Sequence, residues 1–558
     1  MGRRFLALPE RERFRALSRC LRTKEGCAAL KRSKGTGFLL LFLFGFATAL
    51  FLFSRWDELT AAGRVLFGDG GSLGGAFRHV LGSLPGLIRE YSSAFLWAYG
   101  LFIAGVIFLE EKNPDRTIAW LLVLILLPVV GFVLYLFFGP DIRGRGYFRR
   151  LKRKKRRIRQ EGTPQQGGNR GDPMSGSPEQ KTALMLSKSA RALLTTGNSV
   201  KMLLNGEETF SAITDALSRA EKYIHMEYYS IANDTIGNTI KDILIRKAGE
   251  GVRVNVIFDS VGSWDLGTRY VVALKNAGVR VHSFLPVSFP SLRRELNFRN
   301  HRKIVVADGT IGFMGGLNIG DMYIEGEPSI GFWRDTHIEL TGPAVSCLDD
   351  IFRADWAFCD NKPLEDLALA PAPPAGEAPV QIAASGPDNN WKSILQGYFS
   401  LITNARKSVW LCTPYFVPGE PLMTALAVAA MSGVDVRVMI PHKTDHAIVY
   451  WASLSNLEEL LKAGVKVYRY EKGFIHSKIL IADGSSVSVG TANLDARSLE
   501  INFEVQAFIY DASVARDFIR AYENDMEESS QFRLHEWLRR PFSQKVLESA
   551  GRLWSSQL

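Results

Sequence analysis

The chain contains two contrasting hydrophobic patterns. In its first quarter, three apolar stretches carry no charged residue, at residues 37–53, 93–109 and 117–138. A membrane-spanning helix needs ~20 apolar residues, so the third stretch is long enough and the first two are close to the lower limit. From residue 180 onward, short Val- and Ile-rich runs alternate with stretches of helical periodicity. This second pattern predicts α/β layers with largely parallel strand pairing.

The second part of the chain repeats one order of elements. Each copy is predicted to contain a helix, a strand, a second strand preceded by glycine, and a segment ending in AGVRV or AGVKV. These elements are expected at 209–222, 223–228, 252–258 and 274–281 in the first copy, and at 391–405, 408–412, 434–440 and 461–467 in the second. A repeat of this size predicts two similar halves, each a sheet flanked by helices, that pack face to face and pseudo-symmetrically.

Shifts in composition divide the chain into segments. Gly- and Pro-rich sequence at 162–179, and a stretch at 361–390 that contains APAPPAG, are typical of linkers. The predicted divisions are a basic N-terminal region at 1–92, a transmembrane hairpin at 93–140, a basic juxtamembrane run with linker at 141–180, the first half at 181–360, a Pro/Ala-rich linker at 361–390 and the second half at 391–558.

Positive charge is concentrated beside the apolar stretches. The formal net charge is +11, and Lys and Arg cluster at 3–34 and 143–159. Such runs indicate a cytoplasmic location and contact with anionic lipid headgroups. Three spans cannot place both runs in the cytoplasm, so we expect the 93–140 hairpin to span a cell membrane and 37–53 to lie at its interface. The five cysteines include no CxxC pair, which argues against a disulfide framework or zinc ribbon and favours a reducing compartment.

Both halves carry the motif H-x-K-x4-D, followed seventeen residues after the histidine by an asparagine in a turn of small residues. The residues are His301, Lys303, Asp308 and Asn318 in the first half, and His476, Lys478, Asp483 and Asn493 in the second. Because two copies stand in register with the repeat, chance cannot account for them.

These residue types suit chemistry at a phosphodiester. His and Lys are expected to alternate along a strand, so that both point to one face while Arg302 or Ser477 points away. Two Lys and two Asn would then hold the phosphate oxygens by charge and amide donors. One imidazole can attack phosphorus while the other protonates the leaving alkoxide. The sequence shows no dense carboxylate or cysteine cluster, so we expect metal-free chemistry without a cofactor.

An attacking histidine needs an acceptor on its remote ring nitrogen. In the strand that follows each motif, Glu504 is the candidate acceptor for His476, and Asp335 is the candidate for His301. The two motif aspartates are expected to fix the turn and the strand rather than to touch phosphate.

These motifs resemble the phospholipase D superfamily, and longer phrases resemble its cardiolipin synthase branch. The phrases are NPDRTIAWLLVLILLPVVGFVLYLFFGP in the predicted hairpin, NFRNHRKIVVADG and GGLNIGDMY around the first motif, and GTANLDARSLEINFE around the second. The resemblance covers the chain from residue 110 onward. It departs from many superfamily members in placing Gly316 and Thr491 where those members have serine.

The resemblance implies a two-half fold and a phosphohistidine intermediate, with His301 as nucleophile and His476 as acid. It implies transfer of a phosphatidyl group between two phosphatidylglycerol molecules, which gives cardiolipin and glycerol. The expected partners are this anionic lipid and the membrane, without nucleic acid, and the oligomeric state stays open.

Other functions are open on the residues alone. A hydrolytic phospholipase D, or a phosphatidyltransferase with another acceptor, would need the same motifs, and so would a nuclease. A nuclease is disfavoured because the basic runs lie beside apolar segments rather than among aromatics in the two halves. A membrane scaffold would not need the histidine, lysine and asparagine set. Two histidines, His225 and His337, are expected to be structural. Four aromatic residues are expected either to line a lipid entrance or to pack in the core, namely Tyr228, Tyr229, Tyr415 and Phe416.

Overall fold

The chain falls into two compact units, Met1–Pro140 and Asp141–Leu558. The computed structural model describes residues 118, 120–124, 131, 176–177, 179–286, 298–360, 362–364 and 372–554. The segments expected to meet the membrane, at 37–53 and 93–140, and the basic run at 141–180 lie almost entirely outside the described residues. Among those that are described, no helix is both long and apolar enough to cross a membrane.

The first half alternates helices and strands in the predicted manner. Strand β2, predicted at 223–228, spans Tyr223–Tyr228 and is buried at every position, as expected for a strand covered on both faces. The other elements are β1 Leu194–Leu204, α10 Asn205–Arg219, α11 Thr235–Gly249, β3 Arg253–Asp259, η1 Trp264–Leu266, α12 Thr268–Asn276, β4 Arg280–Phe284, β5 Ile304–Ala307, β6 Ile311–Gly315, α14 Met322–Glu325, β7 Phe332–Arg334, β8 Thr336–Thr341 and α15 Ala344–Asp360.

The second half repeats this order. Strand β10, predicted at 408–412, spans Ser408–Cys412. The other elements are β9 Ala378–Ser385, α16 Ser393–Asn404, α17 Glu420–Met431, β11 Asp435–Pro441, α18 Ala447–Ser455, α19 Leu457–Ala463, β12 Lys466–Tyr470, β13 Gly473–Ile475, β14 Ile479–Ala482, β15 Ser486–Gly490, η2 Arg497–Ile501, β16 Glu504–Ile509, α20 Ala512–Glu527, β17 Ser529–Phe532, α21 Leu534–Leu538 and α22 Phe542–Trp554.

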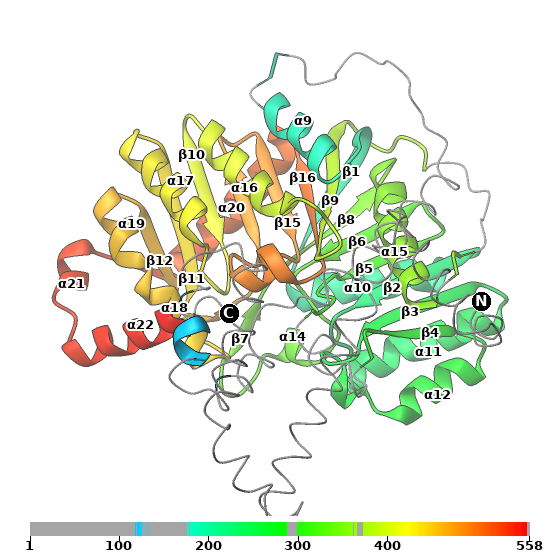
Figure 1. Ribbon diagram of the computed structural model, residues 1–558. Helices are drawn as coiled ribbons and strands as arrows, with labels where there is room; N and C mark the ends of the chain where they lie inside the picture. The colour runs from blue at the N-terminus through cyan, green and yellow to red at the C-terminus, as the bar shows by residue number, and fades with distance from the viewer. Residues whose placement is uncertain are drawn as a thin grey trace, which may run out of the picture. The chain divides into compact units, whose positions relative to one another are not determined.

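Fifteen of the described strands form one continuous sheet, in the order β17-β12-β11-β10-β14-β15-β16-β9-β1-β8-β6-β5-β2-β3-β4. The order reverses about the β9–β1 pair, which confirms the pseudo-symmetry of the two halves (Figure 1). Within this sheet, parallel pairing is confined to β2-β3-β4 and β10-β11-β12, and the pairs between these groups are antiparallel. The prediction of a largely parallel sheet is therefore wrong.

Two predicted boundaries are also wrong. The segment 361–390 is not a connector throughout, because its residues Ala378–Ser385 form β9, which pairs with β1 and β16 in the middle of the sheet. Helix α9, Gln180–Ser189, opens the predicted first half but packs against the second. Buried Gln381 of β9 holds it there by donating to the carbonyl oxygen of Ala183 at 3.0 Å.

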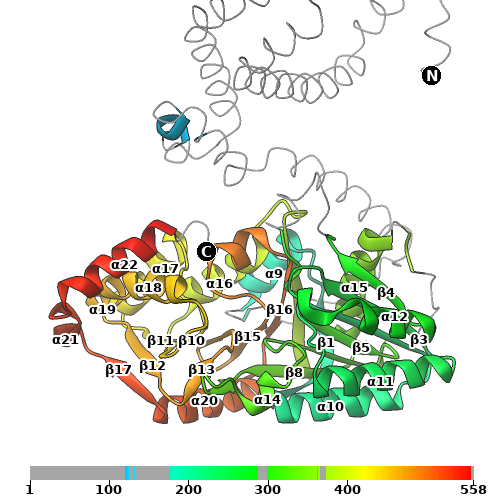
Figure 2. The same ribbon diagram turned by 90° about the horizontal axis from the view of Figure 1, so that it is seen from below.

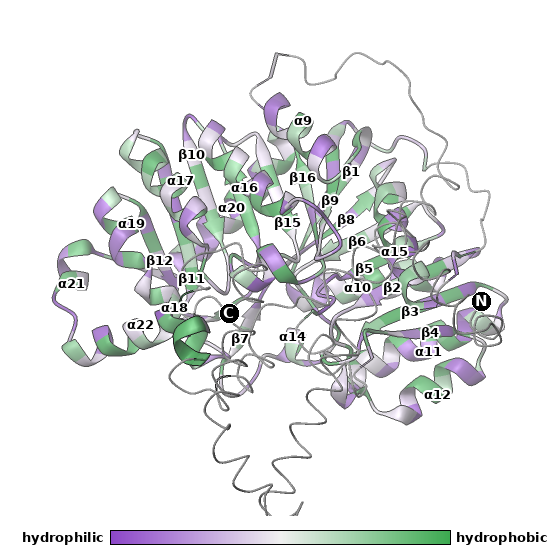
Figure 3. Ribbon diagram, viewed as in Figure 1, coloured by the Kyte–Doolittle hydropathy of each residue, from purple (hydrophilic) through white to green (hydrophobic). Residues whose placement is uncertain are grey.

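The described residues form four hydrophobic clusters, and the three largest hold the sheet between its helices. One lies under α16, α17 and α19, and another lies under α10, α11 and α12. Figure 2 shows α16 and α17 on one side of the sheet and α10 and α11 on the opposite side. The third core combines residues of both halves, including Ile304 and Ile479 at the starts of β5 and β14, with α15 and α20. The strands are correspondingly apolar in Figure 3. The face-to-face packing that the repeat predicts is only part of the interface between the two halves, because the pairing of β1 with β9 also joins them.

Candidate active site

The two motif histidines lie just before the strands rather than within them. Strand β5 begins at Ile304, directly after Lys303, and β14 begins at Ile479, directly after Lys478. The prediction that His and Lys alternate along a strand is therefore wrong in its placement. The intervening Arg302 does point elsewhere, since it donates to the carbonyl oxygens of Glu504 and Ser385 at 3.1 and 3.0 Å.

The segment that carries each histidine pairs with a segment of the opposite half. Asn300 forms a parallel bridge with Phe503, and the amide of His301 donates to the carbonyl oxygen of Phe503 at 2.9 Å. In the same way β13 pairs in parallel with β7, and the amide of His476 donates to the carbonyl oxygen of Arg334 at 2.7 Å. Parallel pairing brings the residues that follow each pair side by side.

The residues that follow are a histidine and a carboxylate. Nδ1 of His301 lies 3.0 Å from Glu504 Oε2, and Nδ1 of His476 lies 2.7 Å from Asp335 Oδ2. The predicted pairing of His301 with Asp335 and of His476 with Glu504 is therefore wrong, because each histidine takes its carboxylate from the other half. Both carboxylates are fully buried. With Nδ1 held in this way, Nε2 of each ring is the nitrogen left to react.

The two carboxylates have different neighbours in the small-residue turns. Thr491 donates its hydroxyl to Glu504 Oε2 at 2.5 Å, whereas a side chain on Gly316 would overlap the carboxylate of Asp335. In the first half, the amide of Thr336 donates to Asp335 Oδ1 at 2.8 Å. At both positions, the residue that replaces serine therefore suits the adjacent carboxylate. Thr491 supplies a hydroxyl donor to Glu504, and Gly316 leaves room for Asp335.

The motif lysines are buried beside the histidines. Lys303 and Lys478 each donate from Nζ to the backbone carbonyl oxygen of the histidine two residues earlier. Burial lowers the pKa of Lys303 to about 7 and that of Lys478 to about 8, while Glu504 and Asp335 oppose the shifts. Each lysine also helps to lower the pKa of the other half's histidine, so the two motifs share one electrostatic site.

Both histidines have a pKa below the ordinary imidazole value, and this shift favours the neutral ring. Burial lowers the pKa of His301, and Glu504 opposes the shift. Burial and then Lys478 lower the pKa of His476 to about 4, against the opposing effect of Asp335. A neutral imidazole can attack phosphorus directly. A histidine that acts as acid must first gain a proton, which an arriving phosphodiester anion favours.

The asparagines and aspartates of the motifs occupy different places. Asn318 accepts from the amide of Ser230 at 3.3 Å and donates to the hydroxyl of Tyr323 at 3.2 Å. Buried Asn493 keeps an Oδ1 without a hydrogen-bond partner among the described residues. Asp308 accepts from three consecutive amides at residues 221–223, and Asp483 does the same at 406–408. Both aspartates therefore fix turns, as predicted, and contact neither histidine in the described structure.

Aromatic rings flank the two imidazoles. The ring of Tyr229 lies edge-on to His301 at 5.1 Å, and the ring of Tyr415 lies edge-on to His476 at 6.5 Å. Trp333, whose ring lies 5.0 Å from that of His476, was not predicted from the sequence, because it stands in no motif. Tyr228 and Phe416 are buried in the cores, which confirms core packing for these two.

The two histidines expected to be structural both lie in the interior. His225 bonds Asp349 at 2.6 Å and stacks on Phe352, as expected of a structural residue. His337 is equally buried, but neither of its ring nitrogens has a hydrogen-bond partner within the described ranges.

Comparisons with known proteins agree with this geometry. Residues 213–356 and 398–526 match the family described as cardiolipin synthase, phospholipase D-like domain, and residues 87–140 match the phospholipase D-nuclease N-terminal family. Cardiolipin synthase 2 of Bacillus anthracis is 43% identical over 84% of this chain and 90% of its own. The major cardiolipin synthase of Bacillus subtilis (strain 168) is 40% identical over 81% of this chain and 95% of its own. The chain belongs to the cardiolipin synthase family.

A solved structure supports the fold of this cardiolipin synthase family member. The phosphatidylserine synthase of Haemophilus influenzae Rd KW20 aligns with a TM-score of 0.51 and 16% identity, over 68% of this chain and 100% of that one. Similarity at this level concerns the α/β fold alone.

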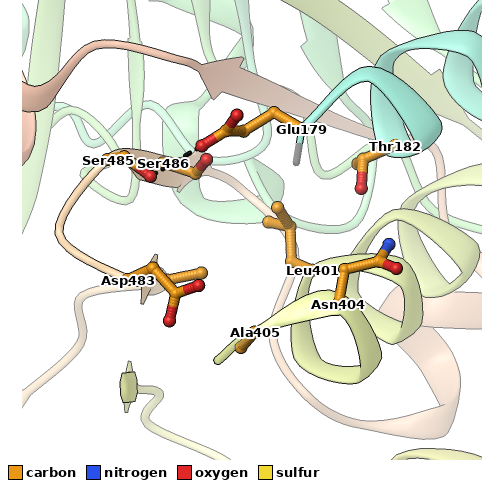
Figure 4. A pocket seen from close by; sticks show the side chains of 9 residues that line it. Glu179, Thr182, Leu401, Asn404, Ala405, Asp483, Ser485 and Ser486 are labelled. Atoms are coloured by element: carbon orange, nitrogen blue, oxygen red, sulfur yellow. Dashed lines mark hydrogen bonds between the residues drawn. The ribbon is translucent and has the colours of Figure 1, made fainter. Parts of the chain in front are cut away.

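Two further features bear on where the family's chemistry takes place. Figure 4 shows a pocket whose lining includes Asp483, Ser485 and Glu179 but no motif histidine or lysine, so it is not the reaction site. Over the described ranges, no three His, Cys, Asp or Glu side chains are grouped so as to hold a metal ion.

Proposed function

We propose that the chain transfers a phosphatidyl group from one phosphatidylglycerol molecule to another through a phosphohistidine. The observation that carries the proposal is the pair of motif histidines, one buried and one largely buried, each with Nδ1 held by a carboxylate of the opposite half. This arrangement supplies two oriented imidazoles in one site, which is what a double displacement at phosphorus needs.

In the first step, Nε2 of His301 attacks phosphorus and forms a P–N bond. The P–O bond to the glycerol headgroup breaks, and His476 gives its proton to the departing glycerol oxygen. In the second step, a glycerol hydroxyl of another phosphatidylglycerol attacks the same phosphorus and His476 takes its proton. The P–N bond breaks, and cardiolipin leaves. Each step exchanges one bond at phosphorus for another, so no nucleotide is consumed. The assignment of His301 as nucleophile rests on the resemblance, since the two centres are nearly symmetric.

The surrounding groups fit the charge of this reaction. The phosphodiester is an anion, and Lys303 and Lys478 supply positive charge to its non-bridging oxygens when protonated. Asn318 and Asn493 lie in the turns that follow the motifs, and their side-chain NH2 groups would donate to the phosphate oxygens. Burial of the site limits access of water, which favours an alcohol as acceptor over hydrolysis.

The proposed setting is a bacterial cell membrane, with a multi-pass anchor in the hairpin at 93–140 and the two halves in the cytoplasm. The apolar stretches and the flanking basic runs of the sequence support this location. The donor and the acceptor would both be lipids of that membrane.

The test is to purify the full chain in detergent, add phosphatidylglycerol in mixed micelles, and identify products by mass spectrometry. We expect cardiolipin and glycerol in equal amounts, and neither product from His301→Ala or His476→Ala. Phosphatidic acid in place of cardiolipin would overturn the transfer step and leave a hydrolase. No turnover of any lipid would overturn the proposed function as a whole.

A further inference from the structure

Helix α22 presents its apolar side chains to solvent. Phe542 is 80% exposed, Val546 49% and Leu553 84%. Their spacing of four and seven residues puts them on one face of the helix, together with Ala550. A helix at the surface of a water-soluble protein ordinarily shows the opposite orientation.

The face of α22 that packs on the protein is the polar one. Glu548 is 3% exposed and forms an ion pair with Arg540 at 2.9 Å. One turn later, Gly551 lies against the backbone of α18, where an added Cβ would stand 2.6 Å from the amide nitrogen of Ala452. A helical projection places Glu548 and Gly551 opposite the apolar row. Helix α22 is thus fixed by its polar face and leaves its apolar face uncovered in the described structure.

The exposed charges around the apolar row have one sign. In residues 538–554 the exposed charged side chains are Arg539, Lys545 and Arg552, and the acid of this segment is the buried, paired Glu548. An apolar row flanked by Lys and Arg is complementary to a bilayer surface that contains anionic phospholipid.

The helix is also connected to the reaction site. Figure 1 shows α22 beside α18, against which it packs. Helix α18 begins at Ala447, and two residues earlier Asp445 accepts a hydrogen bond from the hydroxyl of Tyr415 at 2.5 Å. Tyr415 lies edge-on to His476. A surface that binds α22 would therefore lie next to the second-half side of the site.

We propose that α22 docks the two catalytic halves onto an anionic lipid bilayer. The row Phe542, Val546 and Leu553 enters the boundary between headgroups and acyl chains, and Lys545 and Arg552 contact lipid phosphates. The choice of a bilayer as partner rests on the proposed function, whereas the docking itself is measured without turnover.

The experiment uses the full chain reconstituted in vesicles of phosphatidylglycerol and phosphatidylcholine, doped with a phosphatidylglycerol that carries a photoactivatable group in its acyl chain. After illumination, cross-linked peptides are mapped by mass spectrometry. We expect label between Phe542 and Leu553, reduced at least about tenfold when all three apolar residues are changed to serine. Val546→Ser alone should reduce the label, while Val272→Ser on the exposed surface of α12 should not.

Two measurements separate docking from folding and from chemistry. The melting temperature of the triple variant should equal that of the parent, because the changed side chains are exposed. Its turnover of a monomeric short-chain phosphatidylglycerol should also be unchanged, and loss of that turnover in the parent would count against the proposed function instead. Absence of lipid label on α22 in the parent overturns the docking proposal. Cross-links from α22 to a second copy of the chain, or equal label in vesicles of phosphatidylcholine doped with a neutral probe lipid, overturn the choice of an anionic bilayer.

Discussion

The crossed pairing of histidines and carboxylates predicts that each carboxylate variant behaves like the variant of the histidine in the other half. Glu504→Gln keeps the size of the side chain and removes its charge from a fully buried position 3.0 Å from His301. A hydrogen bond to a charged group is worth about 1.5–3 kcal/mol, so a loss of about 10- to 150-fold is expected even if the ring stays in place. If the amide turns its NH2 group toward Nδ1, the wrong tautomer is favoured and the loss approaches about 10⁴-fold, as in serine-protease triads.

The assay uses a phosphatidyl ester of p-nitrophenol, because nitrophenolate leaves without a proton. Formation of the phosphohistidine then releases a burst of colour that needs the nucleophile but not the acid. We expect Asp335→Asn and His476→Ala to retain the burst, and Glu504→Gln and His301→Ala to lose it. With phosphatidylglycerol, all four variants should be slow.

Two different results would count against this reasoning in different ways. If Glu504→Gln matches His476→Ala, and Asp335→Asn matches His301→Ala, the crossed pairing is refuted. If each carboxylate variant matches its observed partner but the burst survives in the His301 and Glu504 variants, the pairing stands and the order of the two histidines is reversed.

Three further outcomes follow from the site. Burial lowers the pKa of Lys303 to about 7, so the free enzyme loses the positive charge of this lysine as pH rises. The value of kcat/KM for phosphatidylglycerol should therefore fall above about pH 7. A profile that stays level up to the ordinary pKa of lysine would contradict this expectation. Gly316→Ala should push the carboxylate of Asp335 away from its histidine and lower kcat by about 10- to 100-fold, while Gly249→Ala, where the added Cβ meets nothing within 4 Å, should leave kcat unchanged. Asp308→Asn, at a φ of 53° that Asn tolerates, should lower the free energy of unfolding by about 1–3 kcal/mol in a denaturant titration, with kcat per folded molecule preserved.

The local hydrophobic pattern was sufficient to predict the bounds of strands that consist mainly of apolar residues. The run Tyr223–Tyr228 and the run Ser408–Cys412 have the bounds predicted for them, because apolar runs next to turn residues identify a buried strand. Strand β9 escaped prediction because its Ala-, Gln- and Ser-containing sequence is weakly strand-forming. Its burial comes from its place between β1 and β16, which no local window contains.

The residue types of the site could be predicted, whereas their partners could not. Two copies of one motif identified the histidines and lysines, and the need for an acceptor identified Glu504 and Asp335. The partners are separated by 203 and 141 positions and are brought together by strand pairing between the halves. An assumption that each half is complete in itself therefore assigned each carboxylate to the wrong histidine.

The crossed pairs also determine when, during synthesis, the chain can first act on lipid. A ribosome that has completed the first half has made His301, but Glu504 is still to come. A chain released before residue 504 therefore contains His301 without the carboxylate that orients it, although His476 already has Asp335. The pair of oriented imidazoles is therefore complete only once β16, near the end of the chain, has taken its place beside His301.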